Sequence, residues 1–226
     1  MVKKIFCLSL CFLLLFSFTA CTKGDKVNNA IEKTADLSSK DAEVLIAVDG
    51  YLGADYLSVD IKNNILINGD NAVVSPVLNG TKGEPVRFEG DFVYVGEEKH
   101  NRVNYVQANG SYDDIINAML IKFGSTVLED VIYESYGNKE TAKFFLLEGT
   151  LPDQFPTLWE SICKGIESYG CSVENLVAGE ATVSIYIYEG YATRVEVAFP
   201  VSNKEVNLSL HFGVYINNPG EEVTVK

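Results

Sequence analysis

The amino-acid sequence predicts an α+β fold: a curved antiparallel β-sheet, a half-barrel of about ten strands, with two or three helices covering its apolar face. Three observations predict it. Apolar and polar residues alternate in many short runs, which is typical of strands with one buried face. Turn signals such as Asn-Gly and Gly-Asp separate these runs. Few segments show helical spacing, too few for alternating strand and helix units.

The N-terminus has the pattern of an export signal. Two lysines precede an apolar run of 14 residues, 5–18, which is short of the roughly 20 needed to cross a bilayer as a helix. Thr19-Ala20-Cys21 follows and resembles the lipobox of bacterial lipoproteins, in which the cysteine thiol is diacylglycerylated and the signal is cleaved just before it. We expect residues 1–20 to be a signal peptide and Cys21 to be lipidated. An ordinary secretory signal with an incidental cysteine and an uncleaved anchor are the alternatives.

A lipidated Cys21 places the chain on the extracytoplasmic face of the bacterial cell membrane. Two acyl chains hold a protein on a bilayer stably, whereas one does so only marginally. Residues 21–29 are polar and lack periodicity, which predicts that they form a short flexible stalk. Residues 30–226 are expected to form a single domain, because a chain of this length can bury one continuous core.

The predicted elements of the domain begin with a short helix over residues 29–39, where Ile31, Ala35 and Leu37 are the apolar positions. A series of strands follows, at residues 43–49, 56–67, 72–78, 86–95, 103–107, 128–136 and 142–147. The clearest alternation lies at the end of the chain, in residues 183–189, 193–199 and 206–214. These last three strands are predicted to form an antiparallel meander.

Two segments between the strands have helical spacing. In residues 111–123 the apolar positions fall on one face, and Ser111 is the expected N-cap. Residues 152–168 repeat the pattern, and Gly170 supplies a stop signal. Each helix is apolar on one side only, so each is expected to cover the apolar face of the sheet.

The number and positions of the cysteines are consistent with export of the chain. If the signal leaves and Cys21 carries lipid, the folded domain keeps Cys163 and Cys171. Two thiols in an exported domain can pair, and closing so short a loop would stabilise the fold by roughly 2.5 kcal/mol in the chain-entropy model. The alternative is two separate thiols, because Cys163 falls within a predicted helix and Cys171 follows a glycine.

Composition excludes two classes of protein. The chain has 226 residues with 18 Lys and Arg against 31 Asp and Glu, a net charge of −13, so it lacks the clustered cations that nucleic-acid binding needs. Because 47% of the residues are hydrophobic, the chain is also too apolar to be disordered.

The order of elements resembles the LolA/LppX/LprG-like lipoproteins. An exported lipoprotein with an N-terminal helix, a long antiparallel meander and two helices before the final strands has their arrangement, and residues 214–226 are similar to the last strand and extension of related proteins. The resemblance covers about residues 27–226. It implies an incomplete β-barrel closed by helices over an apolar cavity, and carriage or sensing of a lipid or another apolar molecule at the membrane. It does not imply an enzyme, and we expect no catalytic residues, no cofactor and no metal.

If a cavity is present, the apolar residues of the final strands and of the two helices are expected to line it. These residues are Met119, Phe123, Phe155, Trp159, Ile162, Ile185, Ile187, Val195, Val197, Leu208, Leu210 and Phe212. The alternative is that they interlock as a dry core. In that case the protein would be an accessory subunit of a cell-envelope complex, with a protein partner and no ligand.

The polar face of the final strands offers little chemistry. Tyr186, Tyr188, Tyr191 and Tyr215 are expected to form an exposed aromatic patch, which could mark a partner surface or serve cross-strand packing. His211 is expected to lie beside Arg194 and Glu196. Without a placed nucleophile or a metal cluster, a salt bridge between strands explains this group better than acid–base catalysis does.

Overall fold

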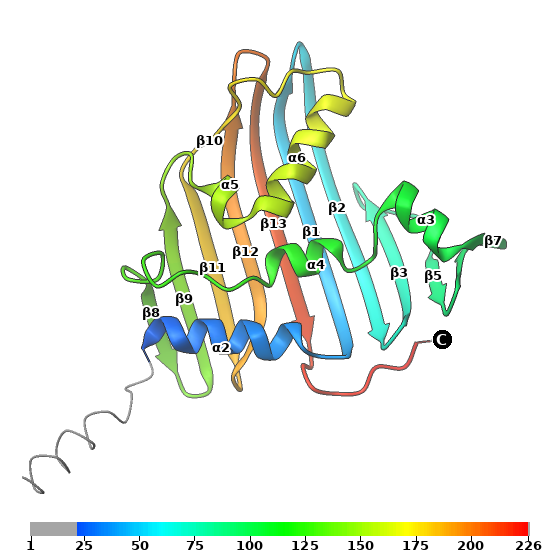
Figure 1. Cartoon of the computed structure of the whole chain (residues 1–226), viewed down its shortest axis with the longest axis horizontal. Helices are drawn as coiled ribbons and strands as arrows, with labels where there is room; N and C mark the ends of the chain where they lie inside the picture. The colour runs from blue at the N-terminus through cyan, green and yellow to red at the C-terminus, as the bar shows by residue number, and fades with distance from the viewer. Residues whose placement is uncertain (1–21, 226) are drawn as a thin grey trace, which may run out of the picture.

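The computed structural model describes residues 22–225. They form one antiparallel sheet in the order β7-β6-β5-β3-β2-β1-β13-β12-β11-β9-β8, with β10 beside β12 and β4 beside β3 (Figure 1). The longest strands are β1 (Ser39–Leu52), β2 (Asp55–Asn68), β3 (Asn71–Leu78), β9 (Lys139–Leu146), β11 (Ala181–Tyr188), β12 (Tyr191–Ser202) and β13 (Val206–Asn217). The shorter strands are β4 (Thr81–Lys82), β5 (Val86–Glu89), β6 (Phe92–Val95), β7 (Glu98–Asn101), β8 (Ile132–Tyr136) and β10 (Val177–Ala178).

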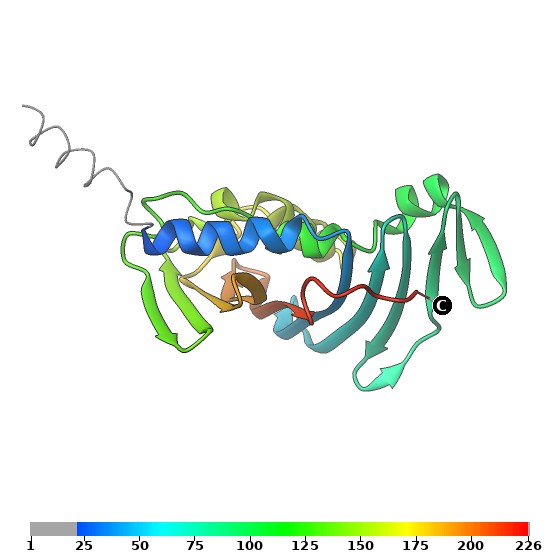
Figure 2. The same ribbon diagram turned by 90° about the horizontal axis from the view of Figure 1, so that it is seen from below.

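Five helices accompany the sheet in the described part of the chain. They are α2 (Lys23–Ala35), α3 (Arg102–Asn109), α4 (Asp114–Met119), α5 (Leu151–Gln154) and α6 (Pro156–Ser168). Figure 2 shows that the sheet is curved and that α2, α4, α5 and α6 lie on one side of it. The predicted fold class is therefore confirmed, with thirteen strands in place of about ten.

The final meander is confirmed strand by strand. β11 pairs with β12, and β12 with β13, with Val195 opposite both Ile185 and Val214. β1 closes on the other side of β13, with Ile46 opposite Phe212. Because side chains alternate between the faces of a strand, these opposed apolar residues all point to the helix side.

One predicted strand is divided in two, and another is wrong. The segment 86–95 is divided into β5 and β6 by a turn at Gly90, whose φ of +54° favours glycine. Residues 103–107 lie in α3 instead of a strand. The side chain of Asn101 caps this helix by accepting a hydrogen bond from the backbone N–H of Asn104 at 3.2 Å, and the guanidinium of Arg102 donates to the carbonyl oxygens of Asp70 and Gly90.

The predicted helices over residues 111–123 and 152–168 are present but shorter or divided. α4 begins at Asp114, because the side chains of Asp113 and Asp114 accept hydrogen bonds from Ser111, so Ser111 is not the N-cap. The second helix is interrupted at Phe155, which precedes a proline and leaves helical geometry. The break separates α5 from α6.

Residues 23–29 of the segment predicted to be a flexible stalk are helical, so this prediction is wrong for them. Thr22 and Asp25 form a capping box, in which the Asp25 N–H donates to Thr22 Oγ1 at 3.1 Å and the Thr22 N–H donates to Asp25 Oδ2 at 2.9 Å. The side chains of Val27, Ala30, Ile31 and Thr34 are buried at helical spacing. Packing of this face therefore fixes residues 23–35 against the sheet, and Cys21 lies just outside the described residues.

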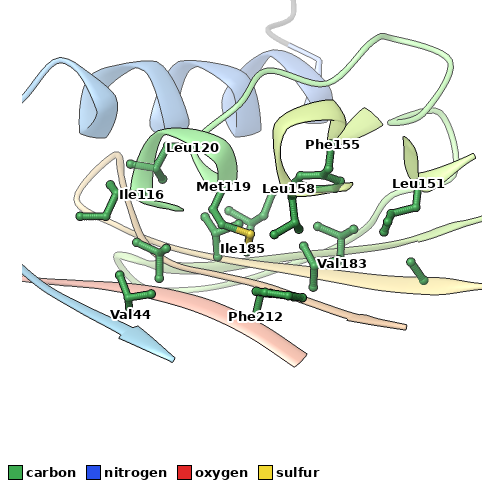
Figure 3. Close-up of a cluster of buried hydrophobic side chains, with 14 of the residues drawn as sticks. Val44, Ile116, Met119, Leu120, Leu151, Phe155, Leu158, Val183, Ile185 and Phe212 are labelled. Atoms are coloured by element: carbon green, nitrogen blue, oxygen red, sulfur yellow. The ribbon is translucent and has the colours of Figure 1, made fainter. Parts of the chain in front are cut away.

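The core lies between the sheet and the helices (Figure 3). Ile116, Met119, Phe155 and Leu158 project from α4, the α5–α6 junction and α6 toward strand residues such as Ile185. An aromatic cluster extends this contact, with the ring of Phe123 at 4.9 Å from Phe144 and 5.5 Å from Phe155 between centroids. The helices thus cover the middle of the concave face.

Candidate functional site

An apolar groove of about 330 Å³ lies on the concave face, between α6 and strands β1, β2 and β13. Of its fifteen lining residues, only Ser161 and Tyr169 have polar side-chain groups. The lining consists of Ile46, Val48, Leu52, Leu57, Ile61, Ile115, Leu158, Ser161, Ile162, Gly165, Ile166, Tyr169, Leu208, Leu210 and Phe212. We call this the β1–α6 groove.

The groove exists because the helices do not cover all of the concave face. α6 packs its buried residues Leu158, Ile162 and Ile166 over the sheet. Beyond α6, the inward side chains of Ile46 and Leu57 remain only partly buried. Gly165 contributes space on the helix side, since no atom lies within 4 Å of the position that a Cβ would take there.

A second hollow of about 320 Å³ adjoins the groove and shares Ile46, Ile115 and Ser161 with it. It continues under α3 and α4 toward the apolar residues Val74 and Phe88 of β3 and β5, and its rim carries polar residues from the α3–α4 junction. Together the two hollows make an elongated depression, apolar at the floor and more polar toward α3.

The structure brings four of the predicted cavity residues to this groove: Ile162, Leu208, Leu210 and Phe212. The others do not line it. Trp159 is half-buried on α6, and seven residues lie in the closed core: Met119, Phe123, Phe155, Ile185, Ile187, Val195 and Val197. Sequence reasoning missed the β1 and β2 residues of the groove, although the alternation of Leu57, Val59 and Ile61 with polar residues was the signal for one apolar face of β2.

The opposite face of the sheet holds a polar cluster around Glu196. Its Oε1 accepts hydrogen bonds from Arg194 at 2.6 Å and from the hydroxyl of Tyr215 at 2.7 Å, and lies 3.4 Å from Nε2 of His211. The guanidinium of Arg194 is stacked between the rings of Tyr186 and Tyr215, at 4.7 and 4.8 Å. The predicted neighbourhood of His211 is therefore confirmed.

The electrostatics of this cluster are those of an ion pair between Arg194 and Glu196, although Nε of Arg194 is buried without a hydrogen-bond partner. Burial raises the pKa of Glu196, but the hydrogen bonds from Arg194 and Tyr215, together with the attraction of the Arg194 charge and of His211, outweigh it, so the pKa is lowered overall. Burial and the hydrogen bond to Glu196 raise the pKa of Tyr215 to about 12. A carboxylate engaged by two donors is poorly placed to accept a proton from a substrate.

The predicted aromatic patch on this face is smaller than expected. Tyr186 and Tyr215 enclose Arg194 and are only partly exposed, and the Lys33 ammonium lies 3.6 Å from the centre of the Tyr191 ring. Of the four tyrosines predicted to form the patch, only Tyr188 is exposed. An open hollow of about 840 Å³ beside the cluster is lined by charged residues of both signs, with Arg194 already paired.

Cys163 and Cys171 are both free thiols, so the possible disulfide is not formed. The sulfur of Cys171 lies near Gly53 at the β1–β2 turn. Burial and the nearby charge of Glu167 raise the pKa of the Cys163 thiol. Within residues 22–225, no cluster of His, Cys, Asp and Glu has the makings of a metal site, and no helix is long and apolar enough to span a bilayer.

Comparison with known proteins finds similarity in solved structures only. No protein family matches the sequence, and no curated protein matches it significantly. The lipoprotein LppX of Mycobacterium tuberculosis is 16% identical, with a TM-score of 0.38, over 89% of this chain and 96% of that one. A LolA superfamily protein of Nitrosomonas europaea is 11% identical, with a TM-score of 0.34, over 88% of this chain and 95% of that one.

Both TM-scores are low, so neither likeness supports an argument about this chain. At these identities and TM-scores, neither of them indicates what this chain binds. The class of ligand is therefore inferred from the geometry of the β1–α6 groove.

Proposed function

We propose that this chain is an extracytoplasmic lipoprotein, anchored to the cell membrane through an acylated Cys21, that binds a lipid or another elongated apolar molecule in the β1–α6 groove. The role is non-enzymatic. The observation that carries the proposal is the groove itself: about 330 Å³ lined almost wholly by hydrocarbon and left open between α6 and the sheet. This volume lies within the range of small-molecule sites in proteins.

The chemistry of the lining selects the ligand class. Ser161 and Tyr169 are its only side chains with hydrogen-bonding groups, so a polar ligand would lose its hydration without compensation. An acyl chain instead gains about 0.8 kcal/mol for each methylene removed from water. The adjoining hollow, with Asn63 and Asp114 in its lining, could accept the polar end of such a molecule.

The test is uptake of a fluorescent fatty-acid analogue by the purified protein after removal of bound lipid. Saturable binding at micromolar concentration is expected. Gly165→Leu should abolish it or weaken it at least about tenfold, because the new side chain enters the open space opposite the sheet. Helical geometry at residue 165 tolerates leucine well, so the variant should fold.

Lys164→Leu is the matched control. It adds the same side chain at the neighbouring position of α6, where the lysine side chain is 70% exposed. Binding by Lys164→Leu should equal that of the unmodified protein. If the unmodified protein shows no saturable uptake, or if both variants behave alike, the ligand proposal fails. An accessory subunit of a cell-envelope complex, with a protein partner and no ligand, would then be the better account.

A further inference from the structure

One end of the sheet presents an apolar surface that no other part of residues 22–225 covers. β8 is the terminal strand, and on the outer face of β8 and β9 the side chains of Ile132, Tyr136 and Phe145 are exposed, Tyr136 to 89%. Leu147, just after β9, is 71% exposed. We call these four residues the β8–β9 patch.

The strand register explains why these side chains share a face. β9 buries Ala142, Phe144 and Leu146 against the core, so the alternate residues face outward. Among these are Lys139, opposite Tyr136, and Lys143, opposite Ile132. Lys143 Nζ lies 5.3 Å from the centre of the Phe145 ring. In a chain with a net charge of −13, this face thus combines exposed apolar side chains with two cations and one exposed anion, Glu134, which is opposite Thr141.

The N-terminal end of α2 lies against the inner face of the same hairpin, the face opposite to the patch, because Tyr133 and Glu140 are on the side of the buried Ala142. Lys26 Nζ is 3.6 Å from Glu140 Oε1 and 5.6 Å from the centre of the Tyr133 ring. Figures 1 and 2 both show this end of α2 beside β8 and β9. The described chain therefore begins at the edge of the sheet that carries the patch.

The connection between this edge and Cys21 is short. Thr22 is the N-cap of α2, held by the capping box with Asp25, and Cys21 is the residue before it. One residue spans at most about 3.6 Å. An acylated Cys21 would therefore hold the membrane surface within a few ångströms of the first turn of α2. This turn lies beside β8, the terminal strand, so the lipid could also reach the outer face of the hairpin around the free edge of the sheet.

We propose that the β8–β9 patch docks on the lipid bilayer in which Cys21 is anchored. The proposal rests on the proposed acylation. The side chains suit the interface: tyrosine has an apolar ring and a polar hydroxyl, Phe145 and Leu147 can enter the acyl region, and Lys139 and Lys143 attract anionic headgroups. Docking fixes the orientation of the domain on the membrane.

Depth-dependent quenching of tryptophan fluorescence tests this orientation. Trp159 is the only tryptophan, so Trp159→Phe gives a background in which Tyr136→Trp or Phe145→Trp reports on the patch. Tyr56→Trp is the matched control, because Tyr56 is 58% exposed at the distant tip of the β1–β2 hairpin. The full-length lipoproteins are reconstituted into phosphatidylcholine and phosphatidylglycerol vesicles that contain lipids brominated on the upper acyl chain.

Quenching at positions 136 and 145 should exceed that at position 56 by at least about threefold, since interfacial side chains enter the headgroup and acyl boundary. Equal quenching at all three positions, or quenching at position 56 alone, overturns the proposal. The proposal is also overturned if quenching at positions 136 and 145 does not exceed quenching at position 56 and crosslinking captures dimers. The free edge of β8 would then pair with a second copy of the chain.

Mass spectrometry of the same preparations separates the two hypotheses. An acylated chain without quenching at position 136 overturns the docking face and leaves the anchor intact. An unmodified Cys21 overturns the anchor, and the docking face with it. Ligand uptake in the β1–α6 groove is measured independently and should be unchanged by Tyr136→Trp.

Discussion

The side-chain hydroxyl of Thr34 accepts a hydrogen bond from the backbone N–H of Ala192 at 2.8 Å, across 158 positions of sequence. The same hydroxyl donates to the carbonyl oxygen of Ala30 at 2.9 Å. Thr34 is fully buried, and Ala192 stands near the start of β12. This contact ties the last turn of α2 to a central strand of the sheet.

Thr34→Val should destabilise the protein. Valine has nearly the same shape but leaves the buried N–H of Ala192 without an acceptor, which costs about 1–3 kcal/mol. For a domain of this size, thermal unfolding should move down by a few degrees to about 10 °C. Thr34→Ser keeps the hydroxyl and is the control. Equal losses in the two variants would show that packing of the methyl group, and not the hydrogen bond, matters at this position.

Gly50→Ala should disrupt the pairing of β1 with β13. Gly50 has a φ of +141°, and a Cβ there would lie 2.1 Å from the carbonyl oxygen of Asn207. Since the clash is with backbone, we expect a loss of at least about 2 kcal/mol, measured as a lower urea midpoint. Gly69→Ala is the control. Its φ is +57° but nothing lies within 4 Å, so the expected loss is about 1 kcal/mol. A larger loss for Gly69→Ala than for Gly50→Ala would contradict the close approach of β1 and β13 at Gly50.

Glu196→Gln should change how stability depends on pH. The pKa of Glu196 is lowered from 4.5 in the folded protein, so its hydrogen bonds stabilise the fold fully above pH 4.5 and lose this effect as the pH falls through the folded pKa. The unmodified protein should therefore exceed the variant in stability at pH 7, by about 1–3 kcal/mol.

This difference should shrink on acidification below pH 4.5. Chemical denaturation at pH 7 and at about pH 3.5 measures it. Glu148→Gln, on an exposed residue, should have little effect at either pH. If the difference in stability between the unmodified protein and the Glu196→Gln variant stays constant with pH, the carboxylate charge is not what stabilises the cluster.

Cys163 and Cys171 should both react with a thiol reagent in the unfolded, unreduced protein, because neither is in a disulfide. Mass spectrometry after alkylation without reductant should find two added groups on these residues. Cys163→Ser should change the unfolding temperature little, since the side chain is only partly buried on α6. A protein that gains alkyl groups at these positions only after reduction would contradict the structure.

The fold was predictable from local patterns, because alternation along a strand reports which face is buried. The runs that became β11, β12 and β13 show this in residues such as Val195 and Leu210. Alternation predicted the wrong element where local hydrogen bonds determine the backbone conformation. Residues 103–107 have strand-like composition, yet the cap at Asn101 and the bonds of Arg102 favour a helix.

The groove was only partly predictable. Leu208, Leu210 and Phe212 were identified by alternation, but so were Val195 and Val197, which lie in the closed core. An inward-facing residue lines a groove or fills a core according to whether a helix lies above it. Sequence periodicity gives the face of a side chain but not what covers that face.

The sequence by itself determined the fold class and the strand alternation that creates one apolar face; export and lipidation are predictions from it. The tertiary structure decided that residues 23–35 pack as a helix instead of forming a stalk, that Ile46 and Leu57 stay partly uncovered beside α6, and that α2 begins beside the hairpin of β8 and β9. The reason is physical: apolar spacing is a property of neighbours along the chain, whereas coverage and proximity depend on contacts between residues far apart in sequence.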